Sequence, residues 1–162
     1  MRFKKIHGKA VFIDEFIDHY RRIRKRLSFP HAAAKTIIKL LFPKSKRLGK
    51  GAFKSAYYVY SRKRDLVLKV SKTKNLKNDL KAYKKVPKTK RNRYLGKIYW
   101  HTKYCLLQKW GKKPRGLSKK DPRLIKLKKK LKYYGLTDIR PDNVCFFDGV
   151  LKAVDVSVRK RR

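Results

Sequence analysis

The sequence predicts an α+β fold in which a helical N-terminal segment precedes a small sheet, followed by a helix, a loop and a β-hairpin. Three observations support this prediction. Apolar residues recur at helical spacing over residues 13–23, β-branched and aromatic residues cluster after residue 46, and an Asp-Gly pair bisects the apolar run 144–158. With 162 residues, 41% of them hydrophobic, the chain is long enough to bury a core.

Two helices are expected within residues 1–45. The first has an apolar face and a basic face, and Asp14 and Glu15 are expected in its first turn, where carboxylates interact favourably with the helix dipole. The second helix is expected to begin near Ala32 and to stop at Pro43. The apolar face of the first helix consists of Ile13, Phe16, Ile17, Tyr20 and Ile23.

A hairpin and a third strand are expected over residues 47–72, because strand-forming residues flank the polar run 62–65. A short helix marked by Leu76, Leu80 and Tyr83 follows and ends before Pro87. Two more strands are expected at residues 98–100 and 104–108. These elements predict a small twisted sheet accompanied by one helix.

The C-terminal third contains a helix with signals at both ends. Asp121 and Pro122 form an N-cap and first-position pair, and Gly135 suits a C-terminal cap. An apolar stripe on this helix comprises Leu124, Leu127, Leu131 and Tyr134. Further on, the pair Asp148-Gly149 predicts a two-residue hairpin turn.

Charge is the most unusual property of the composition. The chain has 50 Lys and Arg residues against 10 Asp and Glu residues, a formal net charge of +40. This imbalance favours a polyanionic partner, and we expect nucleic acid bound through its phosphates by the stretch 109–132 and the tail 159–162. The alternative is a lysine-rich surface that only confers solubility. Aromatic residues interleaved with the basic runs could stack on bases, although we expect most of them in the core.

The N-terminal segment, the cysteines and the histidines indicate mainly which features are not expected. No uninterrupted apolar run follows residues 1–7, so we expect neither a cleaved signal peptide nor a transmembrane helix, and an intracellular location, cytoplasmic, nuclear or nucleoprotein-associated. Cys105 and Cys145 are interpreted as buried strand residues. The four histidines have no zinc-ligand spacing, so neither a disulfide framework nor a structural metal site is expected.

Two features in the predicted sheet suggest phosphate binding. The run 49–54, Gly-Lys-Gly-Ala-Phe-Lys, lies between two predicted strands, where glycines let backbone amides approach a polyphosphate; an ordinary turn is the alternative. Lys69 is the single lysine within the apolar strand Val67 to Val70, where burial would require an anionic partner. The alternative is an edge strand with Lys69 directed to solvent.

A third feature is the run 136–144, Leu-Thr-Asp-Ile-Arg-Pro-Asp-Asn-Val, between the capped helix and the hairpin. Asp138 and Asn143 are five residues apart, and Asp155 follows Asn143 by twelve residues. With the glycine loop and Lys69 upstream, this order resembles the protein-kinase superfamily. The triplet Asp155-Val156-Ser157 resembles the metal-binding loop of the RIO family of atypical kinases.

The resemblance implies a kinase-like N-lobe at residues 46–108 and a truncated C-lobe at 109–162, preceded by a helical extension at 1–45. It also implies ATP and Mg²⁺ as cofactors, with Asn143 and Asp155 as metal ligands. Asp138 would be the catalytic base, and Arg140 would neutralise charge on the transferred phosphoryl group. The implied nucleotide-binding residues are Gly49, Lys50, Gly51, Ala52 and Phe53 over the phosphates, Lys69 on the α- and β-phosphates, and Gln108 to Trp110 beside adenine.

The sequence departs from the superfamily pattern at several positions. Lys54 stands where a third glycine is usual, and Leu136-Thr137 replaces the histidine and arginine that usually precede the aspartate. The helix glutamate that would orient Lys69 has no counterpart, and Asp79 is the available substitute. Asp79 can also be interpreted as a solvated helix acid.

Three functions from different classes are consistent with the sequence. The first is an ATP-dependent atypical protein kinase that transfers phosphate to a Ser or Thr hydroxyl and associates with nucleic acid through its basic surface. The second is a pseudokinase or ATP-binding switch bound to nucleic acid. The third is a structural nucleic-acid-packaging or ribosome-associated protein. The acceptor protein and the oligomeric state are not predicted.

Overall fold

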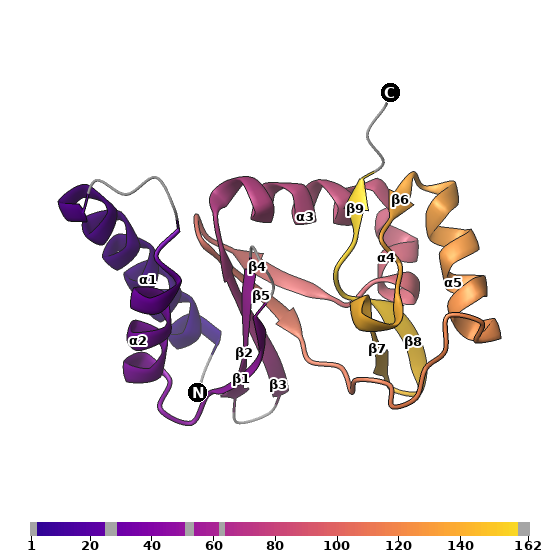
Figure 1. Cartoon of the computed structure of the whole chain (residues 1–162), viewed down its shortest axis with the longest axis horizontal. Coiled ribbons are helices and arrows are strands. Elements are labelled where there is room, and N and C mark those ends of the chain that lie inside the picture. The colour runs from indigo at the N-terminus through magenta and orange to yellow at the C-terminus, as the bar shows by residue number, and fades with distance from the viewer. Residues whose placement is uncertain (1–2, 25–28, 51–53, 62–63, 159–162) are drawn as a thin grey trace. The chain divides into compact units, whose positions relative to one another are not determined.

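The computed structural model describes residues 3–24, 29–50, 54–61 and 64–158. These residues form five α-helices, one five-stranded antiparallel sheet and two two-stranded sheets, so the α+β class is confirmed. Figure 1 labels these elements along the chain. The chain divides into two compact units. The first unit contains Met1–Leu76 and Ile98–Lys109, and the second contains Lys77–Lys97 and Trp110–Arg162.

The first unit is built from two helices and the five-stranded sheet. Its strands are ordered β1-β2-β3-β5-β4, and each pairs antiparallel with its neighbour. The number and order of the helices and strands expected here from the sequence correspond to these elements, but α1 begins earlier than expected. They are α1 (Phe3–Arg24), α2 (His31–Leu41), β1 (Lys46–Lys50), β2 (Lys54–Ser61), β3 (Arg64–Ser71), β4 (Ile98–His101) and β5 (Cys105–Lys109).

One face of the sheet packs against α1 and α2 in a shared hydrophobic core (Figure 1). On β3, Leu66, Leu68 and Val70 are buried in this core, and they alternate along the strand with the residues of the opposite face. Residues 6, 10, 13 and 17 of α1 are fully buried at helical spacing. Residues 1–45, expected as a helical extension, therefore share their core with the sheet.

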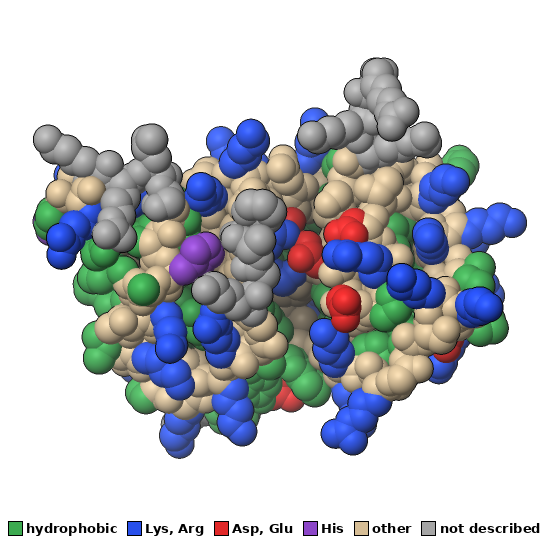
Figure 2. Space-filling model, in the orientation of Figure 1, with side chains coloured by type: hydrophobic (Ala, Val, Ile, Leu, Met, Phe, Trp, Pro, Cys, Tyr) green, Lys and Arg blue, Asp and Glu red, His purple; other side chains and the backbone are tan. Residues whose placement is uncertain are grey.

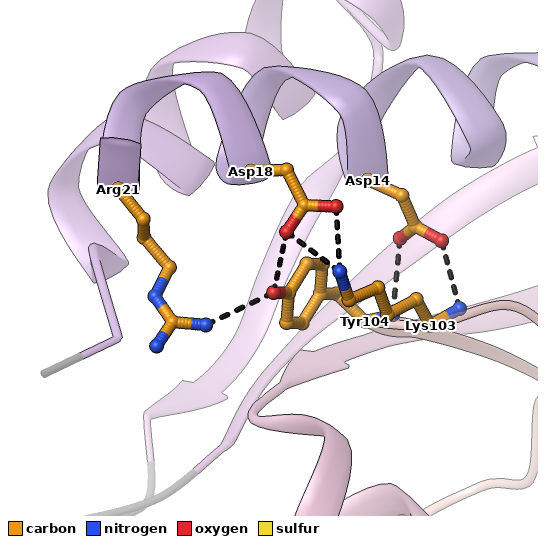
Figure 3. Close-up of polar contacts among 5 residues, drawn as sticks. All are labelled: Asp14, Asp18, Arg21, Lys103 and Tyr104. Carbon is orange, nitrogen blue, oxygen red and sulfur yellow. Dashed lines mark hydrogen bonds and ion pairs between the residues drawn. The ribbon is translucent and has the colours of Figure 1, made fainter. Parts of the chain in front are cut away.

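The helix α1 begins at Phe3, so the expectation that Asp14 and Glu15 lie in its first turn was wrong. The periodicity that indicated the helix continues N-terminally through Ile6 and Ala10. Asp14 is instead a buried mid-helix residue. Its carboxylate accepts hydrogen bonds from the backbone N–H groups of Lys103 (2.7 Å) and Tyr104 (3.0 Å), in the turn between β4 and β5, as Figure 3 shows.

Asp18, one turn further along α1, extends this contact (Figure 3). Its carboxylate accepts hydrogen bonds from the Lys103 ammonium (2.7 Å) and from the Tyr104 hydroxyl (2.7 Å), which also accepts one from Arg21 (3.0 Å). Burial raises the pKa of Asp14 more than its hydrogen bonds lower it. Burial also acts to raise the pKa of Asp18, but hydrogen bonds from Lys103 and Tyr104 outweigh it, so that pKa is lowered.

The second unit contains most of α3 and all the remaining elements. Its core consists of apolar side chains from α3, α5 and the two small sheets, in which β6 pairs with β9 and β7 with β8. The strands β6 and β9 and the helix α4 were not expected from the sequence. The elements are α3 (Thr73–Lys85), α4 (Lys88–Tyr94), α5 (Pro122–Tyr133), β6 (Leu136–Thr137), η1 (Pro141–Asn143, a 3₁₀ turn), β7 (Val144–Phe147), β8 (Val150–Ala153) and β9 (Ser157–Val158).

Local sequence signals in the second unit are confirmed. The Asp121 side chain accepts a hydrogen bond from the Arg123 N–H at the start of α5, with Pro122 at the first helical position. Gly135, just after this helix, has a φ of +70°, which glycine adopts without strain. Asp148 and Gly149 both have positive φ, as the predicted two-residue turn between β7 and β8 requires.

Gly111 is a structural requirement that the sequence did not indicate. A Cβ at this position would lie 2.7 Å from the Phe147 ring and 2.8 Å from Cys145. The linker approaches β7 this closely because Lys112 and Phe146 exchange two backbone hydrogen bonds. Cys145 is only half-buried, so the prediction that both cysteines are buried holds for Cys105 alone.

Basic side chains are spread over the face of the molecule shown in Figure 2, where acidic side chains are few. This distribution follows from the composition, because 50 Lys and Arg residues cannot be placed in the core of a 162-residue chain. Among the helices that the structure describes, none combines the length and the hydrophobicity needed to span a bilayer.

Replacing Asp14 with alanine is expected to lower the free energy of unfolding by about 1–3 kcal/mol, because the N–H of the buried Tyr104 would lose its acceptor. Denaturant unfolding followed by circular dichroism measures this change. Glu15→Ala is the matched control, since Glu15 is an exposed neighbour on the same helix. Equal destabilisation by the two variants would contradict the role assigned to Asp14.

Comparison of the wild type with Asp14→Ala at different pH values tests the direction of the shift in the pKa of Asp14. A carboxyl whose pKa is raised by folding takes up a proton on folding, so its contribution to stability is present at low pH and declines as pH rises from the unfolded pKa through the folded pKa. The stability of wild type relative to Asp14→Ala should decline across that window. A difference that increases with pH there would contradict the direction of the shift.

Candidate functional site

The loop that follows α5 carries three of the residues singled out in the sequence. It begins at β6, which pairs with β9 so that Leu136 lies opposite Val158 and Thr137 opposite Ser157. The Thr137 hydroxyl also donates a hydrogen bond to the Ser157 carbonyl (3.3 Å). This pairing holds the segment containing Asp155 beside the segment containing Asp138.

Asp138 has an unusual backbone conformation, with a φ of +63°. Aspartate is among the few non-glycine residues that adopt this left-handed region, and such conformations cluster at functional sites. The next residue, Ile139, is buried in the core of the second unit, whereas Asp138 and Arg140 are exposed. Anchoring by Ile139 therefore presents the two charged side chains to solvent.

Asn143 connects the loop to Asp138. Its amide nitrogen donates to the Asp138 backbone carbonyl (2.7 Å) and to the Asp138 carboxylate Oδ2 (3.0 Å). The side chain is 8% exposed, and buried Val144 follows it at the start of β7. Because both amide hydrogens are used, the amide oxygen Oδ1 is the Asn143 atom left to act as a ligand.

Asp155 is held next to Asn143 through the backbone. The Asn143 carbonyl accepts hydrogen bonds from the N–H of Val154 (2.9 Å) and of Asp155 (3.4 Å). Val156, which follows, is 9% exposed and belongs to the core of the second unit. Asn143 thus contacts both Asp138 and Asp155, and the structure brings these three predicted residues together.

Arg140 forms an ion pair with Asp138, with its Nε 2.7 Å from Oδ1. The sequence did not predict this contact. Both side chains are well exposed, 60% for Arg140 and 40% for Asp138, so the pair is open to exchange with other charged groups. The nearby Asp142 is 79% exposed and makes only a long ion pair of 3.8 Å with Lys113.

Lys69, on β3, is a buried residue of the first unit, 9% exposed. The strand is third of five and lies between β2 and β5, so the interpretation of Lys69 as a solvent-facing residue on an edge strand was wrong. Lys69 pairs in register with Ala56 and Leu106, on the sheet face opposite α1 and α2. Burial of an ammonium group at this position implies interactions with polar groups.

The other predicted nucleotide-binding residues are described in part. Gly49 lies in β1 opposite Ala56, with open space where a Cβ would point, and Lys50 is the last residue of β1. Gly51, Ala52 and Phe53 lie outside the described residues. In the first unit, Gln108 is 4% exposed and pairs with Val67 and Ile98.

Trp110 and Asp79 belong to the second unit, where both are half-buried; Asp79 lies on α3. The division between the units after Lys109 falls within the stretch 108–110 that was expected to contact adenine. The basic tail 159–162 lies outside the described residues.

The donor set suits a hard divalent cation. The Asn143 amide and the Asp155 carboxylate supply oxygen ligands, the type that Mg²⁺ prefers. Among the described residues, no group of three or more His, Cys, Asp or Glu side chains gathers as a metal site. Of the two predicted ligands, Asn143 and Asp155, only Asp155 is of one of these residue types. Magnesium bound there would take its remaining ligands from water and phosphate, as is usual for this ion.

The sequence matches no model of a known protein family and no curated protein. The interpretation of this site therefore depends on its geometry and on the order of its motifs.

Replacing Asn143 with alanine is expected to lower the free energy of unfolding by about 1–3 kcal/mol, because two hydrogen bonds from a buried amide are removed. Relative to the wild type, the rate of amide hydrogen exchange should increase more in residues 136–143 than in the hairpin formed by β7 and β8. Asp142→Ala is the matched control in the same loop. Uniform exchange, or equal effects of the two variants, would contradict the connecting role of Asn143.

Proposed function

We propose that this chain is a minimal protein-kinase-like phosphotransferase that uses ATP and magnesium. The observation that supports the proposal is the cluster in which Asn143 contacts the carboxylate of Asp138 and the backbone of Asp155. Transfer of a phosphoryl group to a hydroxyl requires a base close to the residues that bind the metal, and this cluster brings an exposed carboxylate together with two residues whose side chains carry suitable oxygens.

The second unit would supply the base and the metal ligands. Asp138 would accept the proton of the attacking hydroxyl, because its carboxylate is exposed and is held by one hydrogen bond at Oδ2 and an ion pair at Oδ1. Asn143 and Asp155 would hold magnesium, which neutralises phosphate charge when bound. Arg140 would exchange its ion pair with Asp138 for a phosphate oxygen as negative charge develops there.

The first unit would bind the nucleotide. Lys69 would contact the α- and β-phosphates, since a buried ammonium group in the central strand is fixed in position by its surroundings. The loop starting at Gly49 would cover the phosphates, and adenine would contact the chain at Gln108 to Trp110.

A non-catalytic ATP-binding switch is the second candidate. The ion pair between Arg140 and Asp138 favours it, because the carboxylate that a kinase would use as its base is engaged by a neighbouring guanidinium group. Turnover separates this candidate from a kinase, and ATP binding separates both from a structural nucleic-acid-binding protein.

ATP binding is expected to depend on both units. Millimolar Mg-ATP should raise the melting temperature of the wild type, and Lys69→Met or Asp155→Asn should each weaken binding about tenfold or more, because each removes a charge that contacts phosphate or metal. Calorimetry measures the affinity, and Asp142→Asn serves as the matched control. The absence of any ATP-dependent heat or thermal shift in the wild type would remove the basis of the proposal.

Assays of phosphate transfer are expected to distinguish the role of Asp138 from the role of Asp155. Asp138→Asn should lower transfer from labelled ATP by about 100-fold or more while ATP affinity changes little, whereas Asp155→Asn should lower both. Basic and acidic test proteins serve as acceptors, and Asp142→Asn is again the control. ATP binding without transfer in the wild type would favour the switch, and equal transfer by Asp138→Asn would exclude Asp138 as the base.

A further inference from the structure

The helices α4 and α5 of the second unit border two neighbouring hollows, which are together called the path. The larger has a volume of about 600 Å³ and is lined by Lys90, Lys129 and Lys132 together with tyrosines. The smaller, of about 330 Å³, reaches the turn between β7 and β8. Tyr94 and Lys130 line both hollows, so the two hollows are adjacent.

The path is strongly positive. α4 and α5 together carry ten Lys or Arg residues and no acidic residue, and the surface over α5 in Figure 2 shows many of these side chains. Asp121 precedes α5 and is engaged by Arg123, whose hydrogen bond lowers the pKa of Asp121 to about 2. In the described part of the chain, Lys90, Lys129, Lys130 and Lys132 form no ion pair. Their charge is available to an anionic ligand.

The sequence of α5 directs these charges outward. Leu124, Leu127 and Leu131 are buried at a spacing of three and four residues, which fixes the rotation of the helix about its axis. The intervening lysines are therefore exposed, and four of them line the hollows: Lys126, Lys129, Lys130 and Lys132. A helix that presents several exposed lysines on flexible side chains is suited to contacting successive phosphates of one strand.

The exposed side chain of Tyr133 distinguishes between the classes of polyanion that could bind along the path. It is the last residue of α5 and is 85% exposed, the most exposed of the large hydrophobic side chains described, although the sequence favoured core positions for most aromatics. Its ring packs edge-on against Tyr134, with ring centroids 5.2 Å apart, and Tyr134 lies 6.5 Å from Tyr94. Apart from this contact, most of the Tyr133 side chain is accessible to solvent.

We infer that the path along α4 and α5 binds single-stranded nucleic acid, with the phosphates on Lys90, Lys129, Lys130 and Lys132 and a base stacked on Tyr133. Stacking platforms within a basic groove characterise sequence-tolerant binding of single strands. A duplex keeps its bases stacked on one another and offers no free face to Tyr133. An acidic peptide would use the lysines but would gain nothing from the tyrosine ring.

The test uses a fluorescent oligothymidylate of about twelve nucleotides, without ATP or magnesium, so that its outcome is independent of the proposed kinase activity. Tyr133→Ala should weaken binding about 5-fold or more, and Tyr133→Phe should bind as the wild type does. Tyr60→Ala, at a tyrosine of β2 that is 57% exposed, is the matched control and should have no effect. Equal affinities of Tyr133→Ala and wild type would overturn the inference.

Charge reversal tests the phosphate interactions. The double variant Lys130→Glu with Lys132→Glu should reduce the slope of log affinity against log salt by about 0.7 for each phosphate that is no longer neutralised. Lys35→Glu with Lys44→Glu makes the same change in net charge at exposed positions of the first unit. Equal reductions in affinity by the two double variants would show that total charge, and not this path, binds the strand.

Two competitors test the class of ligand. A duplex of the same length and polyglutamate should each compete more weakly with the labelled strand than unlabelled oligothymidylate does. Competition by polyglutamate as strong as that by the single strand would assign the path to acidic proteins and overturn the inference. Equal competition by the duplex would exclude the stacking role of Tyr133.

Discussion

The candidate site depends on one side chain, the amide of Asn143. Its nitrogen fixes the carbonyl and the carboxylate of Asp138, and the backbone carbonyl of the same residue accepts the N–H groups of Val154 and Asp155. Asp155 follows Asn143 by twelve positions, and the hairpin of β7 and β8 lies between them. This contact therefore holds the end of the hairpin beside the loop at its start. Ile139 and Val156, both buried, anchor the two segments in the core. The positive φ of Asp138 is maintained by these surroundings.

A second constraint is the scarcity of acids in a chain with a net charge of +40. Several acids that the structure describes occupy positions where a carboxylate is structurally useful. Asp14 holds the turn between β4 and β5, Asp121 caps α5, and Asp138 lies at the left-handed position of the loop. Few acids are therefore left to neutralise the lysines of α4 and α5, and the charge of this surface is a consequence of where the acids are placed.

Features specified by neighbouring residues could be predicted from the sequence, and features specified by distant ones could not. The cap at Asp121, the termination at Gly135 and the turn at Asp148-Gly149 depend on local backbone preferences, and all three were predicted. The role of Asp14 depends on residues about ninety positions away, and the need for glycine at position 111 depends on the packing of Phe147. In the site, the order of motifs indicated Asp138, Asn143 and Asp155, but the ion pair of Arg140 depends on side-chain geometry.

The two proposed activities of the second unit use the same helix framework without sharing side chains. The buried leucines of α5 hold the helix in the core, and its C-terminus leads through Gly135 directly into β6 and Asp138. The lysines and Tyr133 project from the solvent-facing side and contribute little to that core. Changes on the exposed face should therefore leave the loop geometry intact, because the contacts that fix the loop come from Asn143, Ile139 and Val156. The proposed nucleic-acid binding and the proposed phosphate transfer should thus be separable by mutation, and a variant that loses both would indicate loss of the fold.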